Sequence, residues 1–287
     1  MSMNNDTNNP ELSPLIVTSP HSGRFYPRFF LDNLDTDLDI CKSIEDMFVD
    51  ELIEDLKSLN ISIHKAFISR SVLDLNRKLK ELDLKLVDGE LPFEVENSKY
   101  VKSGIGLIPI NCPGGKIEFK NKIKNNEVSY LINEYYKPWH LHLNRMIQSR
   151  LERFGRAFIL DCHSMPSKNF FENEDLSLPD FILGDCYGSS CNKNNINFLK
   201  DFLVNNNYSV DINYPYAGGY ITKNYHNHKL NIETLQIEIR RDLYMNEINF
   251  EKNRGFSKIK DILTEMITHL NMLILSECNV QNVNAAQ

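Results

Sequence analysis

The stretch TLQIEIR at residues 234–240 alternates strictly between apolar and polar side chains. Successive side chains of an extended strand point to opposite faces, so one face of this segment is apolar and the other is polar, with Glu238 at its centre. A sheet covered by helices on both sides normally has two apolar faces. The polar face therefore predicts a strand that borders a cleft; the alternative is an exposed edge strand.

The rest of the chain alternates between strand and helix patterns. Short apolar runs typical of buried strands occupy residues 15–18, 61–68, 72–75, 157–160, 181–183 and 208–212. Helical spacing of apolar residues predicts helices at 43–59, 127–154 (bent at Pro138), 194–203 and 256–275. This alternation predicts an α/β fold with three α/β/α layers around a mixed, largely parallel central sheet.

Composition narrows the class of protein. The 287 residues suffice for one domain, which we place at 13–287 after a polar, Asn-rich tail at 1–12 that we expect to be flexible. The net charge of −7 argues against a general nucleic-acid binder, and no apolar run reaches the ~18 residues of a membrane span. The six cysteines form no C-x-x-C pair, which is typical of a reduced, cytoplasmic protein. The oligomeric state is not readable from the sequence.

Two histidines follow the predicted strands at 15–18 and 157–160. His21 and His163 each come within three residues of a strand's carboxyl end, where ligands gather in open α/β sheets. Two imidazoles and a carboxylate can hold a zinc ion and leave a fourth position for water. The alternative is that each histidine is a hydrogen-bonded structural residue.

The carboxylate has two candidates, Asp46 and Asp50, which are four residues apart and would share one face of a helix. Asp46 also fits a capping box that begins at Ser43, and Asp50 fits a plain surface position. Spacing alone leaves both open.

Two further segments carry polar groups suited to a ligand. Arg70, Asn76 and Arg77 lie close together in the chain, and guanidinium groups bind carboxylates with paired hydrogen bonds, as an acidic amino acid would require. Surface ion pairs are the alternative. The segment AGGYIT at 217–222 contains paired glycines that let the backbone approach a ligand, although a tight turn explains them equally well.

A competing chemistry would use a cysteine nucleophile. The segment GDCYG at 184–188 imitates the nucleophile elbow of α/β hydrolases, with Cys186 at its centre. Asp211 and either His226 or His228 follow in the required order. This hypothesis leaves His21, His163 and Glu238 without a role.

In their order along the chain, these segments resemble the N-formylglutamate amidohydrolase family. The resemblance spans roughly residues 14–250 and is carried by SPHSG at 19–23, SR at 69–70, DLNR at 74–77, DCHS at 161–164, GD at 184–185, GGYIT at 218–222 with Tyr225, QIE at 236–238 and YM at 244–245.

The resemblance implies a zinc-dependent amidohydrolase with a phosphorylase/hydrolase-like fold similar to that of zinc carboxypeptidases and aspartoacylase. Its substrate would be N-formyl-L-glutamate or a related N-acyl acidic amino acid, in amino-acid catabolism and specifically histidine degradation. One Zn²⁺ per chain is expected, although other divalent metals are possible. The implied roles are metal binding by His21, Asp46 and His163, catalysis by Glu238 and Arg70, and substrate binding by Asn76, Arg77, Gly219, Tyr220, Thr222 and Tyr225.

The family's relatives use a His-x-x-Glu pair for two metal ligands, whereas here the spacing is His21-Ser22-Gly23-Arg24. The third ligand must therefore come from elsewhere, and the resemblance of residues 46–50 to the family's acidic helix favours Asp46. A non-catalytic protein that captures acidic amino acids is a further alternative from a different class.

Overall fold

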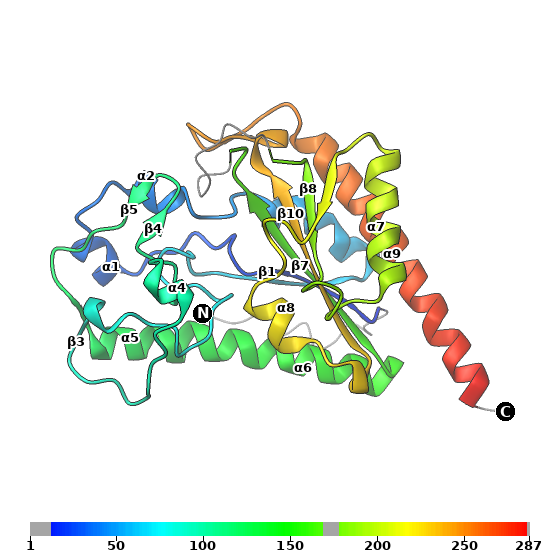
Figure 1. The fold of residues 1–287 in the computed structure, drawn as a ribbon, viewed down its shortest axis with the longest axis horizontal. Coiled ribbons are helices and arrows are strands. Elements are labelled where there is room, and N and C mark those ends of the chain that lie inside the picture. The colour runs from blue at the N-terminus through cyan, green and yellow to red at the C-terminus, as the bar shows by residue number, and fades with distance from the viewer. Residues whose placement is uncertain (1–12, 169–177, 286–287) are drawn as a thin grey trace.

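A six-stranded sheet forms the centre of the computed structural model, which describes residues 13–168 and 178–285 (Figure 1). The strands are β1 (Leu15–Ser19), β2 (Ser62–Lys65), β7 (Ala157–Met165), β8 (Phe181–Gly184), β9 (Val210–Ile212) and β10 (Ile232–Arg240), in the order β2-β1-β7-β10-β8-β9. Neighbouring strands are parallel except for β10 and β8, which are antiparallel. The predicted mixed, largely parallel sheet is confirmed.

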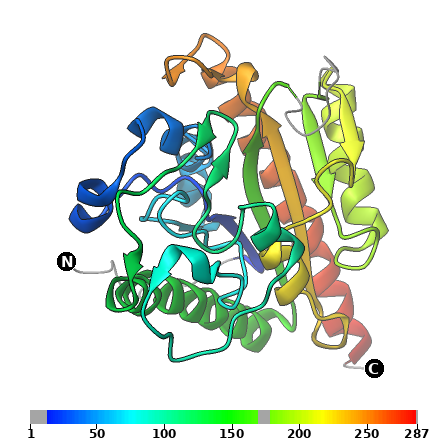
Figure 2. The same ribbon diagram turned by 60° about the vertical axis from the view of Figure 1, so that its left-hand side comes forward.

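Helices cover both faces of this sheet. One face packs against α3 (Val49–Leu52), η1 (Glu54–Leu59), α7 (Lys193–Asn205) and α9 (Phe256–Ala285); the other packs against α6 (Lys137–Phe154) and α8 (Tyr220–Tyr225). Figures 1 and 2 show α7 and α9 together on one side, with α6 and α8 on the other. The three-layer α/β/α architecture is therefore confirmed.

The remaining elements are short. They comprise α1 (Arg28–Asn33), α2 (Leu38–Lys42), η2 (Leu84–Leu86), α4 (Lys99–Lys102), α5 (Asn125–Leu131), η3 (Ile132–Tyr136), η4 (His228–Leu230) and η5 (Arg241–Leu243), with the two-stranded pairs β3 (Val87–Asp88) with β6 (Ile123–Lys124), β4 (Asn111–Cys112) with β5 (Gly115–Lys116), and β11 (Met245–Asn246) with β12 (Glu251–Lys252). Most of those before α6 form a lobe beside the sheet's α6 face (Figure 1).

Alternation along the strands divides the interior into two apolar cores. Val17, Leu160 and Ile237 belong to the core beneath α7 and α9, whereas Ile16 and Ile159 belong to the core beneath α6. Towards the carboxyl ends of the strands, the α6 face changes from apolar to polar. The polar face predicted for residues 234–240 lies there, and the edge-strand alternative is wrong because β10 lies between β7 and β8.

The helix predicted at 43–59 is wrong in its first part and broken in the rest. Residues 43–48 form turns, Phe48 adopts a left-handed backbone with φ of 65°, and only α3 and the 3₁₀ segment η1 follow. A bulky residue rarely takes this conformation, which cannot continue a right-handed helix. The capping interpretation of Asp46 fails with it, because no helix begins at Ser43.

Two strand predictions also need correction. The segment 61–68 is a strand only at Ser62–Lys65, and the chain then leaves the sheet. Residues 72–75 form turns, in which Val72 and Leu73 both donate their backbone N–H to the Ser69 carbonyl. Their side chains are buried, so the apolar pattern at 72–75 indicates a buried segment but not a strand.

The helix predicted at 127–154 is present as three consecutive segments, α5, η3 and α6. The distortion lies at η3, a π-helical stretch immediately before Pro138, because proline cannot donate the backbone hydrogen bond that a regular helix needs there.

Across 13–168 and 178–285, none of the helices is both long and apolar enough to cross a membrane. The tail expected at 1–12 lies outside the described residues, and the single domain at 13–287 stays a prediction.

Leu160 lies at the centre of β7 and is fully buried. We expect Leu160→Ala to lower the free energy of unfolding by ~2–5 kcal/mol, because it removes buried methyl groups and leaves a cavity. Val204→Ala, on the exposed side of α7, is the matched control and should change it by no more than about 0.5 kcal/mol. Urea denaturation measures both; equal effects would contradict the assigned core.

Candidate metal centre and active site

The polar groups of the site gather where β1, β7 and β10 end. His21 lies in the turn after β1. His163 lies within β7, which continues to Met165, beyond the strand end predicted at residue 160. Glu238 on β10 is the direct register partner of His163, so both side chains emerge on the same face of the sheet. Asp46 reaches this face from the turn before α3, and its backbone N–H donates to the His21 carbonyl at 3.0 Å.

His21, Asp46 and His163 form a compact, buried group. One ligand atom from each lies within 4.8 Å of the other two, and all three side chains are at most 3% exposed. Asp46 Oδ2 is 2.9 Å from His163 Nδ1 and 3.4 Å from His21 Nδ1. The structure thus brings together the three residues implied as metal ligands, which are called the metal group below.

Outer carboxylates determine which nitrogen of each histidine carries a proton. His21 Nε2 is 2.7 Å from Asp74 Oδ1, and His163 Nε2 is 2.8 Å from Asp161 Oδ2. An ionised carboxylate only accepts hydrogen bonds, so both Nε2 atoms must be the donors. In the neutral imidazoles, each Nδ1 then presents a lone pair towards Asp46, and His21 Nδ1 has no hydrogen-bond partner.

This convergence of acceptors requires a positive charge. Burial acts to raise the pKa of Asp46, but its contacts with His163 and His21 outweigh burial and hold the pKa well below its usual range. Burial acts to lower the pKa of His163, yet Asp161 and Asp46 hold it well above its usual range. A divalent cation supplies the same charge, and histidines whose second nitrogen donates to a carboxylate are typical metal ligands. The donor set therefore fits a metal ion.

Asp50, the other carboxylate candidate, faces away from this group. Its Oδ1 accepts from Arg24 Nη2 at 2.7 Å, and Lys65 lies 3.7 Å from its other oxygen. Both partners are surface cations, so the tertiary structure favours Asp46 as the third ligand.

Arg241 holds the far oxygen of Asp46. Its Nη2 donates to Asp46 Oδ1 at 3.2 Å, its Nε to Ser164 Oγ at 3.1 Å, and its Nη1 to the Ser43 carbonyl at 2.8 Å. Ser164 Oγ also donates to Asp46 Oδ1 at 3.2 Å. Asp46 is thereby fixed with Oδ2 directed at the histidines.

Glu238 is a buried carboxyl close to the metal group. Burial raises its pKa to about 7, an effect that His163 opposes and Asp46 reinforces. Its Oε1 accepts a hydrogen bond from Gln236 Nε2 at 2.8 Å. A carboxyl that exchanges its proton near neutral pH is suited to general acid–base catalysis.

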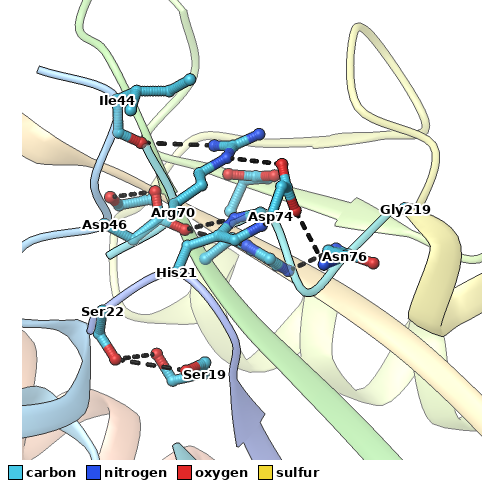
Figure 3. Close-up of polar contacts among 12 residues, drawn as sticks. Ser19, His21, Ser22, Ile44, Asp46, Arg70, Asp74, Asn76 and Gly219 are labelled. Atoms are coloured by element: carbon cyan, nitrogen blue, oxygen red, sulfur yellow. Dashed lines mark hydrogen bonds and ion pairs between the residues drawn. The ribbon is translucent and has the colours of Figure 1, made fainter. Parts of the chain in front are cut away.

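Arg70 lies near the metal group, in the loop between β2 and Asp74. Figure 3 shows its guanidinium held between the Asp74 carboxylate and the Ile44 carbonyl, with Nε–Oδ2 and Nη1–O distances of 3.0 and 3.4 Å. Burial acts to lower its pKa, but the charges of Asp74 and Asp46 outweigh burial and raise it, so Arg70 stays cationic. It carries donors beyond those two bonds and is available to an anionic ligand.

Asn76 and Arg77 make mostly internal contacts. Asn76 Oδ1 accepts from the Ile221 backbone at 2.7 Å. Arg77 donates to the carbonyls of Ile105 and Asn76, and its guanidinium lies 4.5 Å from the ring centre of Tyr100. These contacts fix the loops around the site, and a direct role of either residue in substrate binding stays a prediction.

The segment at 217–225 packs against Asn76 and Gln236. Gly219 donates its N–H to Gln236 Oε1 at 2.7 Å. The Tyr220 ring centre is 5.7 Å from that of His140, Tyr225 OH is 2.6 Å from His140 Nδ1, and the Thr222 carbonyl accepts from Thr234. The described contacts of Thr222 and Tyr225 anchor α8 to β10 and α6; binding of substrate by this set stays a prediction.

Four groups important to the site were given no role from the sequence: Asp74, Asp161, Gln236 and Arg241. Asp161 precedes His163 by two residues, as Gln236 precedes Glu238, so strand alternation places each pair on one face and could have indicated both. Arg241 carries no such signal, because only the fold brings its segment to Asp46.

Cys186 is placed poorly for nucleophilic catalysis. Burial raises the pKa of its thiol, which disfavours the reactive thiolate. His226 Nδ1 lies 3.1 Å from the Thr222 carbonyl and His228 Nε2 lies 2.7 Å from the Ser189 carbonyl, so both imidazoles are engaged elsewhere.

Comparison with known proteins identifies a sequence family. Residues 13–245 match the pattern of the N-formylglutamate amidohydrolase family. An N-formylglutamate deformylase of Pseudomonas putida is 28% identical over 241 residues, which is 82% of each chain. One of Pseudomonas aeruginosa is 25% identical over 241 residues, covering 82% of this chain and 83% of that one.

Two solved structures are similar to this one. The crystal structure of an N-formylglutamate amidohydrolase from Ralstonia eutropha JMP134 aligns with a TM-score of 0.86 and 30% identity over 92% of this chain and 95% of that one. A gene product of Agrobacterium tumefaciens aligns with a TM-score of 0.65 and 14% identity over 94% and 93% of the two chains, which is a likeness of fold alone.

If the three acceptors bind a divalent ion, the metal should stabilise the folded protein. At 100 times the dissociation constant, zinc should add about 2.7 kcal/mol and raise the melting temperature by roughly 5–10 °C. Asp46→Ala should abolish this shift. Asp50→Ala, which removes a nearby carboxylate paired with Arg24, should retain it. Differential scanning calorimetry of metal-free protein measures the shift, and an equal shift in Asp46→Ala would refute the assignment.

Proposed function

The chain belongs to the N-formylglutamate amidohydrolase family, and on that premise we propose that it hydrolyses N-formyl-L-glutamate to formate and L-glutamate with one divalent metal ion. The observation that carries this proposal is the buried group of His21, Asp46 and His163, with Glu238 as the register partner of His163. The names of the relatives support the substrate.

The proposed metal is zinc, one ion per chain. Two imidazole nitrogens and one carboxylate oxygen form a ligand set that zinc favours in catalytic sites, although other divalent metals accept the same donors. When bound, such an ion supplies positive charge that polarises a carbonyl group and makes hydroxide accessible near neutral pH.

Glu238 is proposed as the general base and then the general acid. It takes a proton from the attacking water, whose oxygen forms a bond to the formyl carbon. It then delivers that proton to the amide nitrogen as the carbon–nitrogen bond breaks, so that glutamate leaves as an amine and the carbon leaves as formate. Burial raises its pKa towards neutrality, which favours both transfers near neutral pH.

Arg70 is proposed to stabilise negative charge in the site. Asp74 and the Ile44 carbonyl hold its guanidinium in place before substrate arrives, so little reorganisation is needed when charge develops on the carbonyl oxygen. We assign contacts with the substrate's carboxylates to Asn76, Arg77 and the segment Gly219–Tyr225.

Hydrolysis of this substrate would place the protein in amino-acid catabolism, at the step of histidine degradation that releases glutamate. We also propose a cytoplasmic location, because all six cysteines are free thiols, as expected in a reducing compartment.

Replacing Glu238 with Gln should separate binding from catalysis. The variant should retain one metal ion per chain, because Glu238 is outside the ligand set, and its kcat should fall by roughly 10²–10⁴-fold with the loss of the proton acceptor. Formate release and metal content measure the two effects. Turnover within a few-fold of the unmodified chain would rule out the role of Glu238.

Chelation distinguishes the competing chemistries. Metal-free protein should release no formate from N-formyl-L-glutamate, and added zinc should restore the activity. Cys186→Ser should stay within a few-fold of the unmodified chain; loss of activity in that variant, with activity resistant to chelation, would instead favour the cysteine nucleophile. Tight binding of acidic amino acids without any turnover would indicate the non-catalytic alternative.

A further inference from the structure

Two buried carboxamides hold the first turn of α8. Gln236 Oε1 accepts from the Gly219 backbone N–H, and Asn76 Oδ1 accepts from the Ile221 backbone N–H, both at 2.7 Å. The two side chains come from β10 and from the loop after Arg70, yet they bind the same short stretch of main chain. Figure 3 shows Asn76 beside Gly219.

The amino group of each carboxamide faces the catalytic machinery. Gln236 Nε2 donates to Glu238 Oε1 at 2.8 Å. Asn76 Nδ2 donates to Asp161 Oδ2 at 3.3 Å and lies 3.1 Å from Nε2 of the ligand His163. Each amide therefore has one end on the turn and the other on a group that the proposed chemistry uses.

The chemistry of the partners fixes the orientation of both amides. A backbone N–H can only donate, so it requires the amide oxygen, and an ionised carboxylate can only accept, so it requires the amide nitrogen. Asn and Gln offer an acceptor and a donor in one rigid plane. Neither Leu nor Met of similar size can make either bond.

The backbone of the turn is itself tightly constrained. Gly218 has φ of 129°, and a Cβ on Gly219 would lie 2.3 Å from Asn76 Nδ2. The main chain thus approaches the amide more closely than a residue with a side chain would allow. The contact with Asn76 accounts for Gly219, and the positive φ accounts for Gly218.

We propose that Gln236 is a positioning residue that fixes the Glu238 carboxylate and couples it to the turn at Gly219–Ile221. Asn76 makes the equivalent link from this turn to the His163–Asp161 pair. The turn, the proton-transferring group and the outer shell of the metal centre therefore hold a single relative arrangement. The proposal rests on the proposed function only in naming Glu238 as the catalytic acid and base.

Gln236→Met tests the first link, because it removes both hydrogen bonds at nearly constant volume. We expect kcat for N-formyl-L-glutamate to fall about 10–100-fold, the range typical of outer-shell partners, while the metal affinity stays that of the unmodified chain. Hydrogen exchange at the Gly219 amide should become faster. Asn76→Leu should instead accelerate exchange at Ile221 and weaken zinc binding about 10–100-fold.

Gln236→Glu separates the two functions of the amide. It retains an acceptor for the Gly219 N–H but replaces the amide donor with a second carboxyl, which must share a proton with Glu238 because two adjacent carboxylates do not both ionise. Exchange at Gly219 should therefore stay close to that of the unmodified chain, while kcat falls as in Gln236→Met. Retained kcat in Gln236→Glu would contradict the requirement for a neutral amide donor beside Glu238.

Asn195→Leu is the matched control, because it removes a fully buried carboxamide that donates to Glu233, outside the site. It should leave both kcat and exchange at 219–221 unchanged. The proposal would be overturned if Asn195→Leu accelerated hydrogen exchange at 219–221 as much as Gln236→Met does. It would also be overturned if Gln236→Met left both exchange and kcat unchanged. If the unmodified chain releases no formate, the proposed function fails, whereas exchange and zinc affinity still decide whether the two amides hold the turn.

Discussion

The site depends on one electrostatic constraint. Acceptor atoms of His21, Asp46 and His163 converge in the protein interior, and a positive charge among them stabilises this arrangement. Two imidazole nitrogens and the Asp46 carboxylate lie within 4.8 Å of one another inside the protein. Such a group is unfavourable unless paired, since buried charge loses its hydration. Asp74, Asp161 and Arg241 each hold the far side of one ligand, so the arrangement persists because an outer layer of hydrogen bonds fixes it.

The central sheet supplies the geometry that this constraint needs. Parallel strands end together, and β1 and β10 flank β7 on either side. Alternation then places Asp161 and His163 opposite Gln236 and Glu238 on one face, while the residues between them fill the core beneath α7 and α9. The two-residue period of the strands therefore places apolar core residues on one face and the polar residues of the site on the other.

The position of Asp46 also accounts for the missing first turns of the helix predicted at 43–59. A helix through residues 43–59 satisfies local spacing, but in this fold Asp46 faces His21 and His163. The chain turns at Phe48, whose left-handed backbone is of a kind that costs on the order of 1–3 kcal/mol. Arg24 and Lys252 each lie 5.3 Å from its ring centre, and these cation–π contacts stabilise the turn.

The sequence by itself determined the three-layer fold, the strand that carries Glu238 and the strand that leads to His163, because apolar periodicity reports which face of a strand is buried. It also narrowed the third ligand to Asp46 or Asp50. Tertiary structure favoured Asp46, and it alone revealed Arg241 and the shared role of Asn76 and Gln236. The contacts of Arg241 with Asp46 and of Asn76 with Ile221 join residues more than a hundred positions apart, and local patterns carry no information about which distant segments the folded chain brings together.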